Sequence, residues 1–278
     1  MTAPTADSLV PLRDTGDLAP LYCIHPVSGS PYCYSGLVNA LDPRRPAFGL
    51  EAPGFDGESE PAGSIAELAE RHAATLLDAR PEGPFLLLGW SLGGVLAYET
   101  ARLLTAAGRE VPLVVVIDAA LRQQIALPPE NEMVRYFLHD FLGVMSGMLG
   151  SATGEAPALD AVLDGLGPAA GPAERLAAVE ASGAVPEEFD AEFLLERFTL
   201  FRAHVTAMYA HTVASVHDGP AVLIRAAESN HALMEWKPFL PRLSSHVVTG
   251  DHHSIWREPG LGEIGAVVSA ALEAGAAR

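Results

Sequence analysis

Positively charged side chains are scarce in this chain of 278 residues. It contains 17 Lys and Arg residues against 35 Asp and Glu residues, a formal net charge of −18, and Lys237 is its single lysine. A surface with this excess of negative charge repels the phosphate backbone of nucleic acids and the headgroups of anionic membranes. The composition therefore predicts neither a nucleic-acid partner nor a membrane partner.

Cysteine is also rare, and long apolar runs are missing. Cys23 and Cys33 are the two cysteines, too few for a disulfide framework, and we expect both to be reduced thiols. No apolar run approaches the roughly 18–20 residues of a membrane span. The N-terminal residues show neither the basic nor the apolar region of a signal peptide. These absences predict a cytoplasmic protein.

What the sequence does contain is a regular alternation of short apolar runs and helical patterns. Hydrophobic residues make up 49% of the chain, as in a globular protein. The predicted strands cover residues 20–26, 47–53, 84–90, 113–118, 220–226 and 246–249, and the predicted helices cover residues 65–80, 92–107 and 261–274. Continuously apolar strands separated by helices indicate an α/β fold with a mostly parallel sheet covered on both faces.

The alternation stops for about one hundred residues between Asp118 and Pro220. Residues 133–149 and 189–216 have helical patterns, whereas 14 of the 23 residues in 151–173 are Gly, Pro or Ala, which predicts weak structure there. We interpret residues of about 120–215 as an insertion within one domain that spans residues 1–278.

Large apolar side chains recur at helical spacing within this insertion. Met133, Phe137 and Phe141 lie on one predicted helix face. They fit core packing, and they also fit the underside of a mobile lid that touches substrate, where Met is suitable because its side chain adapts to varied shapes.

The strongest motif is Gly89-Trp90-Ser91-Leu92-Gly93, between an apolar strand and an amphipathic helix. This context is typical of the nucleophile turn of the α/β-hydrolase fold, in which a sharp strand-to-helix turn exposes the serine hydroxyl. Side chains at the two flanking positions would collide with neighbouring elements, so glycine fits there. The pattern predicts Ser91 as a nucleophile.

A serine nucleophile needs a general base and an acid that orients the base. In this fold the chain order is serine, acid, histidine. His252 and His253 follow the last predicted strand, and either fits the base. Asp118 and Glu228 follow two successive strands, and we prefer Asp118 for the acid. Asp251 is adjacent to His252, and sequence neighbours rarely have the required geometry.

Two backbone N–H groups are candidates for stabilising an oxyanion. Leu92 opens the helix after Ser91, where N–H groups have no helical acceptor. Val27 follows the first predicted strand, directly after Pro26, which has no N–H.

Four segments in this order and spacing resemble a known family. The segments CIHPVSG, GWSLGGVLAYETA, VVVIDA and TGDHH are similar to those of thioesterase domains of nonribosomal peptide and polyketide synthetases. The opening LVPLRDTGDLAPLYCIHP is also similar to the entry segment of such domains, and the resemblance covers about residues 9–274. The GWSLGG form looks more like the product-releasing thioesterases than the separate editing ones.

The resemblance implies a role for each matching position. Ser91 is the acyl acceptor, Asp118 the acid and His252 the base, and the backbones of Val27 and Leu92 form the oxyanion hole. The insertion corresponds to the helical lid of the family. Trp90 in the turn and Met133, Phe137 and Phe141 in the insertion are candidates for substrate contact.

The implied reaction is release of a peptidyl or acyl chain from a carrier protein. The chain arrives as a thioester on phosphopantetheine, is transferred to Ser91, and leaves by hydrolysis or macrocyclisation. The implied partners are the carrier protein and its thioester, the implied state is a monomer, and no bound cofactor is expected. No histidine and cysteine pair at zinc-site spacing accompanies Asp251-His252-His253, so no metal is expected.

Three alternatives remain for the function. A stand-alone editing thioesterase would prefer short acyl chains. A general carboxylesterase would have the same three side chains and would prefer oxoesters. A non-catalytic binding protein would have an incomplete set, and the sequence fills all three positions.

Overall fold

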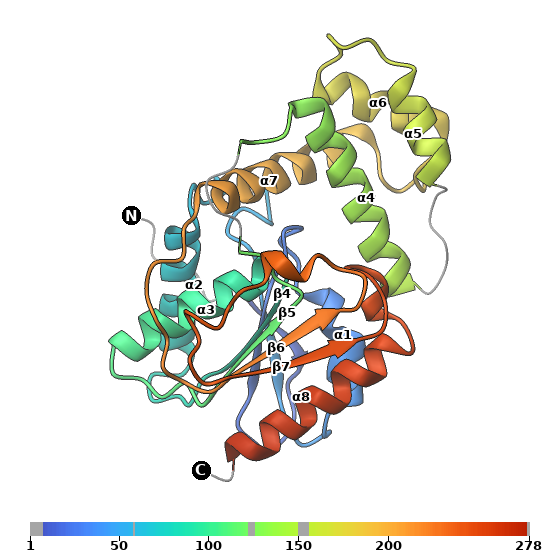
Figure 1. Cartoon of the computed structure of the whole chain (residues 1–278). Helices are drawn as coiled ribbons and strands as arrows, with labels where there is room; N and C mark the ends of the chain where they lie inside the picture. The colour runs from blue at the N-terminus through green and yellow to red at the C-terminus, as the bar shows by residue number, and fades with distance from the viewer. Residues whose placement is uncertain (1–7, 58, 122–125, 150–155, 277–278) are drawn as a thin grey trace.

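A seven-stranded sheet forms the centre of the molecule (Figure 1). The computed structural model describes residues 8–57, 59–121, 126–149 and 156–276. The strand order is β1-β3-β2-β4-β5-β6-β7, and all neighbours are parallel except β1 and β3. The strands are β1 (Leu9–Arg13), β2 (Leu21–Ile24), β3 (Ala47–Leu50), β4 (Leu86–Trp90), β5 (Leu113–Ile117), β6 (Ala221–Ala226) and β7 (Leu243–Val248). The predicted mostly parallel sheet is confirmed.

One strand of this sheet is missing from the sequence-based prediction. Within the described residues, strand β1 lies at the sheet edge and pairs only with β3, with an irregular register between Pro11 and Arg13. A proline within a short run argues against a central strand, but it is tolerated at an edge because one side of an edge strand needs no partner. The apolar signal of β1 is therefore weak.

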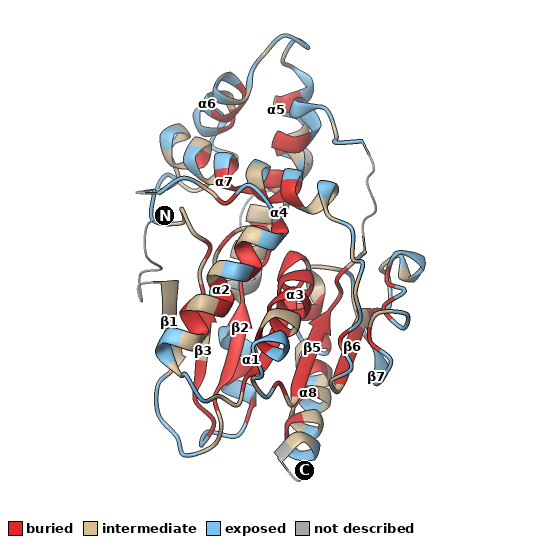
Figure 2. Ribbon diagram, turned by 90° about the vertical axis from the view of Figure 1, so that its left-hand side faces the viewer, coloured by how far each residue is buried: buried red, intermediate tan, exposed pale blue. Residues whose placement is uncertain are grey.

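Helices cover both faces of the sheet. Helices α1 (Ser35–Ala40) and α8 (Gly260–Ala276) contact each other on one face, and α2 (Ile65–Ala79) and α3 (Leu92–Ala106) contact each other on the other. Figure 2 shows that the buried residues concentrate in the central strands and in α3. Two separate hydrophobic clusters result, one on each face, as expected for apolar strands that are covered on both sides.

The insertion between β5 and β6 contains four helices within the described residues. They are α4 (Glu130–Leu149), α5 (Ala156–Asp164), α6 (Pro172–Ser182) and α7 (Ala191–Ala210), and they gather at one end of the molecule (Figure 1). The prediction of weak structure over residues 151–173 is wrong for α5; residues 151–155 lie outside the described part. The α5 segment is rich in alanine, a strong helix former, and it buries Leu159 and Leu163.

Two of these helices reach the carboxyl ends of the parallel strands. Helix α4 contacts the short helices η2 (Tyr32–Tyr34) and η4 (Ser254–Trp256), which follow β2 and β7, and α7 contacts α2. Functional sites of open α/β sheets form at this edge. The insertion therefore lies beside the positions that the sequence singles out.

Candidate active site

Ser91 occupies a strained turn between β4 and α3. Its backbone has φ 56° and ψ −126°, an unfavourable region for a residue with a side chain, and its N–H donates to the Ile117 carbonyl at 2.9 Å. A β-carbon at Gly89 would overlap the Gly93 carbonyl, and one at Gly93 would overlap the Ile24 carbonyl. The two glycines are thus required for the close approach of strand, helix and neighbouring strand.

Tyr34 ties this turn to the end of β2. Its buried hydroxyl donates to the Ile24 carbonyl at 2.7 Å and accepts from the Trp90 N–H at 2.8 Å. One hydroxyl therefore joins the strand before Val27 to the residue before Ser91. The sequence analysis did not identify Tyr34, because no local pattern links it to either strand end.

Replacing Tyr34 by phenylalanine should destabilise the protein. The change leaves the Trp90 N–H buried without an acceptor, which typically costs about 1–3 kcal/mol. Urea unfolding measures the loss. Tyr32→Phe is the matched control, since Tyr32 is exposed in the same short helix and should change stability by less than about 0.5 kcal/mol. Equal effects of the two substitutions would contradict a stabilising role for the hydrogen bonds of the Tyr34 hydroxyl.

Asp118 lies directly after β5 and is buried, with φ 42°. Its Oδ1 accepts from the Ala226 N–H at 2.8 Å, and its Oδ2 accepts from the Ser229 hydroxyl at 2.6 Å and from His252 Nδ1 at 2.7 Å. Burial raises the pKa of Asp118, but the hydrogen bonds from His252, Ser229 and Ala226 outweigh it, so that the pKa lies below its usual value. Asp118 is thus an ionised acceptor for His252.

The contact with Asp118 determines which ring nitrogen of His252 carries the proton. A carboxylate only accepts, so Nδ1 carries the proton, and in the neutral ring Nε2 is left as an acceptor. The ring lies against Trp90, with the ring centroids 4.9 Å apart. The geometry leaves Nε2 able to take a proton, as a general base requires.

The other candidates for acid and base are placed differently. His253 Nε2 lies 3.1 Å from Asp140 Oδ1 on α4 and is not paired with Asp118. Glu228 is exposed, and its N–H donates to the Gly250 carbonyl. Asp251 accepts from the N–H groups of His253 and Ser254, a turn that shapes its own loop. Of the alternatives, only His252 and Asp118 are joined.

The His253 and Asp140 pair connects the His252 loop to helix α4. Burial lowers the pKa of His253, but the hydrogen bond and charge of Asp140, together with the charges of Asp251 and Asp118, outweigh it, so that the pKa lies above its usual value. Helix α4 passes close by, since a β-carbon at Gly143 would lie 2.9 Å from the His253 ring.

This pair should stabilise the protein more at pH 6 than at pH 8.5. A raised folded-state pKa gives a contribution that is fully present below the unfolded value of about 6.5 and is lost as the pH rises through the folded value. Asp140→Asn should therefore lower the free energy of unfolding more at pH 6 than at pH 8.5, as measured with urea. A pH-independent difference between Asp140→Asn and the unaltered protein would show that the pair does not titrate in this range.

The two candidate oxyanion donors lie in the loop after β2 and at the start of α3. In the part of the chain that the structure describes, neither the Val27 N–H nor the Leu92 N–H has a hydrogen-bond acceptor. The Val27 carbonyl accepts from His204 Nδ1 on α7 at 2.8 Å. The role of these N–H groups as oxyanion donors stays a prediction.

The candidate substrate contacts have two kinds of surroundings. Trp90 is buried and lines a cavity of about 300 Å³ together with His253, Trp256, Val144 and Tyr32. In contrast, Met133 and Phe137 are buried in the hydrophobic cluster that covers the α2 and α3 face of the sheet and extends into the insertion. Phe141 is partly buried and packs on Phe137, Phe189 and Phe193. Substrate contact by these residues stays a prediction.

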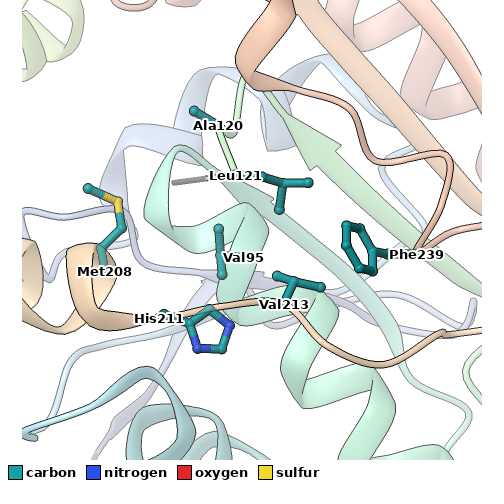
Figure 3. Close-up of a pocket in the computed structure, with 7 residues that line it drawn as sticks. All are labelled: Val95, Ala120, Leu121, Met208, His211, Val213 and Phe239. Carbon is teal, nitrogen blue, oxygen red and sulfur yellow. The ribbon is translucent and has the colours of Figure 1, made fainter. Parts of the chain in front are cut away.

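A second, much smaller cavity lies beside α3 (Figure 3). Its lining residues come from α3, α7 and three connecting segments: Val95, Ala120, Leu121, Met208, His211, Val213 and Phe239. Its volume is about 10 Å³, at most enough for one water molecule. An acyl chain does not fit there without movement of these side chains.

Comparison with known proteins decides the family. The model of the thioesterase domain family matches residues 19–260. The chain belongs to this family. Thioesterases are hydrolases, so the chain belongs to the hydrolase class. Its seven-stranded sheet is that of the α/β-hydrolase fold.

The relatives of this thioesterase domain are much larger proteins, and the similarity covers a short segment of each. A dimodular nonribosomal peptide synthase of Bacillus subtilis (strain 168) is 39% identical over 113 residues, which are 41% of this chain and 5% of that protein. A probable non-canonical nonribosomal peptide synthetase of Salinispora arenicola (strain CNS-205) is 26% identical over 282 residues, covering 96% of this chain and 3% of that protein. The chain thus spans only a small part of these relatives.

Solved structures show the same fold. The NocB thioesterase domain from the nocardicin cluster, in a covalent complex with a fluorophosphonate nocardicin G analogue, has a TM-score of 0.64 at 22% identity, over 95% of this chain and 99% of that one. A four-domain nonribosomal peptide synthetase bound to AMP and glycine has a TM-score of 0.78 at 24% identity, over 95% of this chain and 20% of that one.

Among the described residues, no group of three or more His, Cys, Asp or Glu side chains is arranged to hold a metal ion. In the same residues, no helix has the length and apolar character needed to cross a bilayer.

Proposed function

We propose that this thioesterase domain releases a peptidyl or acyl chain from the phosphopantetheine thioester of a carrier protein through an acyl-Ser91 intermediate. The observation that carries the proposal is the 2.7 Å contact between His252 Nδ1 and Asp118, with the His252 ring packed on Trp90, the residue before the strained Ser91. The names of the relatives, which are nonribosomal peptide synthetases, support the substrate class.

The first chemical step forms the acyl-enzyme. Asp118 holds Nδ1–H of His252, so Nε2 takes the Ser91 proton while Oγ attacks the thioester carbonyl. The Val27 and Leu92 N–H groups stabilise the oxyanion. The carbon–sulfur bond then breaks, and the pantetheine thiolate leaves with its electron pair and takes up the proton that His252 Nε2 accepted from Ser91.

The second step releases the chain. His252 removes a proton from water, or from an amine or hydroxyl of the chain itself, as that group attacks the Ser91 ester. The bond between the acyl carbon and Ser91 Oγ then breaks, and His252 returns the proton to Oγ. Water gives a free acid, and an internal nucleophile gives a macrocycle. Helices α4 to α7 act as the lid, and exclusion of water beneath them favours the ring. No resident cofactor takes part; phosphopantetheine enters as part of the substrate.

A pair of matched esters tests this proposal. The purified protein is incubated with a long-chain acyl pantetheine thioester and, separately, with the oxoester of the same acyl group, while protein mass and products are followed. We expect an acyl adduct on Ser91 and faster cleavage of the thioester. The released acid or ring identifies the second step.

Each other outcome favours a different function. Ready cleavage of the oxoester with no adduct or release from the thioester would indicate a general carboxylesterase. A strong preference for short acyl thioesters would indicate an editing thioesterase. Inertness toward every ester would favour a binding protein.

A further inference from the structure

Three buried histidines meet beneath the Val27 loop. His25 follows β2, His72 belongs to α2 and His204 belongs to α7, and their exposed fractions are 0%, 1% and 0%. The His25 ring lies 5.1 Å from each of the other two rings, stacked on His204 and edge-on to His72. Elements far apart in the sequence thus bring three polar rings together in the core.

The hydrogen bonds set the proton position in each ring. His25 Nδ1 lies 2.8 Å from the Pro26 carbonyl, and His204 Nδ1 lies 2.8 Å from the Val27 carbonyl. A carbonyl only accepts, so both Nδ1 atoms carry protons. His25 Nε2 is then an acceptor, and its partner 3.2 Å away, His72 Nε2, donates.

Burial keeps all three rings neutral, as this pattern requires. Burial lowers the pKa of His72 to about 3 and that of His204 to about 4. Burial, together with the neighbouring His72 and His204, holds the pKa of His25 well below its usual value. The proton positions are therefore the same throughout the neutral pH range.

The two carbonyls that accept these bonds flank the Val27 α-carbon. The Pro26 carbonyl and the Val27 N–H belong to one planar peptide unit, so the direction of the carbonyl sets the direction of the N–H. The Gly29 N–H also donates to the Pro26 carbonyl, at 3.0 Å. The next peptide unit is held through the Val27 carbonyl by His204. Both peptide planes at Val27 are thus held from within the core.

We propose that His25 and His204 are positioning residues that aim the Val27 N–H at the oxyanion, and that His72 orients the His25 ring. The proposal rests on the proposed role of Val27 in the reaction. It also means that α7, a helix of the insertion, directly supports the oxyanion loop. Donation to the Pro26 carbonyl polarises the same peptide unit and makes its N–H a stronger donor.

Core packing alone does not account for this cluster. The Nε2 atom of His204 is buried and has no partner in the described part of the chain. Burying an acceptor without a partner costs free energy that leucine at this position would not incur. We therefore infer that His204 is needed for the hydrogen bond from its other nitrogen, Nδ1, to the Val27 carbonyl.

The first test measures the proton positions directly. Long-range proton–nitrogen NMR of the full chain with ¹⁵N-labelled histidine distinguishes Nδ1–H from Nε2–H rings. We expect Nδ1–H at His25 and His204 and Nε2–H at His72, with assignments from single histidine substitutions. An Nε2–H ring at His25 or His204 would overturn the proposal, whatever the protein hydrolyses.

The second test separates positioning from stability. An alkyl boronic acid binds a reactive serine as a tetrahedral anion, so its affinity reports the oxyanion donors independently of the thioester. His204→Leu should weaken boronate binding and lower kcat at least 10-fold, and at most by the roughly 10²–10³-fold that loss of a whole donor costs. KM should change less than about threefold, because ground-state binding is retained.

A conservative variant and a remote control complete the test. In His204→Asn the amide nitrogen can occupy the place of Nδ1 and should recover most of the loss. His217→Leu replaces another buried histidine, which is outside the cluster, and should leave boronate affinity and kcat unchanged per folded molecule. A loss in His204→Leu that Asn does not recover, or that His217→Leu shares, would overturn the proposal. Boronate binding that depends on His204 in a protein inert to thioesters would contradict the proposed function alone and support the positioning role.

Discussion

Replacement of Ser91 by alanine should reduce thioester turnover by about 10⁶-fold and abolish the acyl adduct. The loss is large because His252 and Asp118 act only through the Ser91 hydroxyl, so that the remaining two groups have no nucleophile to activate. Rates of thiol release and intact-protein mass after exposure to an acyl pantetheine thioester measure both effects.

The Ser91→Ala protein should nevertheless fold normally. Alanine has the same β-carbon and backbone preference as serine, so the strain at φ 56° is unchanged and stability should change by less than about 1 kcal/mol. Ser28→Ala is the control, because Ser28 lies in the loop that carries Val27 and its buried hydroxyl has no hydrogen-bond partner among the described residues. Turnover by Ser91→Ala within 100-fold of the unaltered protein would exclude Ser91 as the nucleophile.

Replacement of Asp118 by asparagine should lower kcat by about 10⁴-fold. Three donors converge on this carboxylate, from Ala226, Ser229 and His252, and it accepts all of them. An amide has one oxygen. If its NH₂ faces the backbone N–H of Ala226, two donors oppose each other. If it faces His252, the ring moves its proton to Nε2 and cannot accept one from Ser91.

Glu228→Gln is the matched control for this substitution. Glu228 follows the next strand and is a candidate acid because of this position. Its side chain is exposed, however, and His252 is hydrogen-bonded to Asp118. We expect Glu228→Gln to retain full turnover. The comparison of kcat at saturating thioester decides between the two carboxylates, and a loss in Glu228→Gln equal to that in Asp118→Asn would refute the assignment of the acid.

The insertion shows how compositional reasoning can mislead. Residues 151–173 are rich in Gly, Pro and Ala, and the sequence analysis predicts weak structure there. Helix α5 forms nevertheless because Leu159 and Leu163 find buried positions in the insertion. In addition, the charged side chain of Arg135 on α4 pairs with Asp160 and Asp164 on α5. Tertiary packing here adds to the helix propensity of the alanine residues in α5.

The sequence by itself determined the features that depend on local geometry. Apolar strands alternating with helices specify the parallel sheet, and a strand, a glycine-flanked serine and a helix specify the turn at Ser91. Each of these patterns can be recognised from a short stretch of sequence, because steric limits on the backbone act between neighbouring residues. Asp118 and the His252-His253 pair could likewise be placed at strand ends, though without a unique partner for either.

Only the tertiary structure decided which distant groups meet. Asp118 and His252 are 134 residues apart in the chain, and packing of β5, β6 and the loop after β7 brings His252, and not His253, against the carboxylate. Tyr34 and the histidines beneath Val27 likewise connect elements that share no sequence pattern. Hydrogen bonds between such groups need ångström-scale placement, which results from the packing of whole elements and leaves no local trace in the sequence.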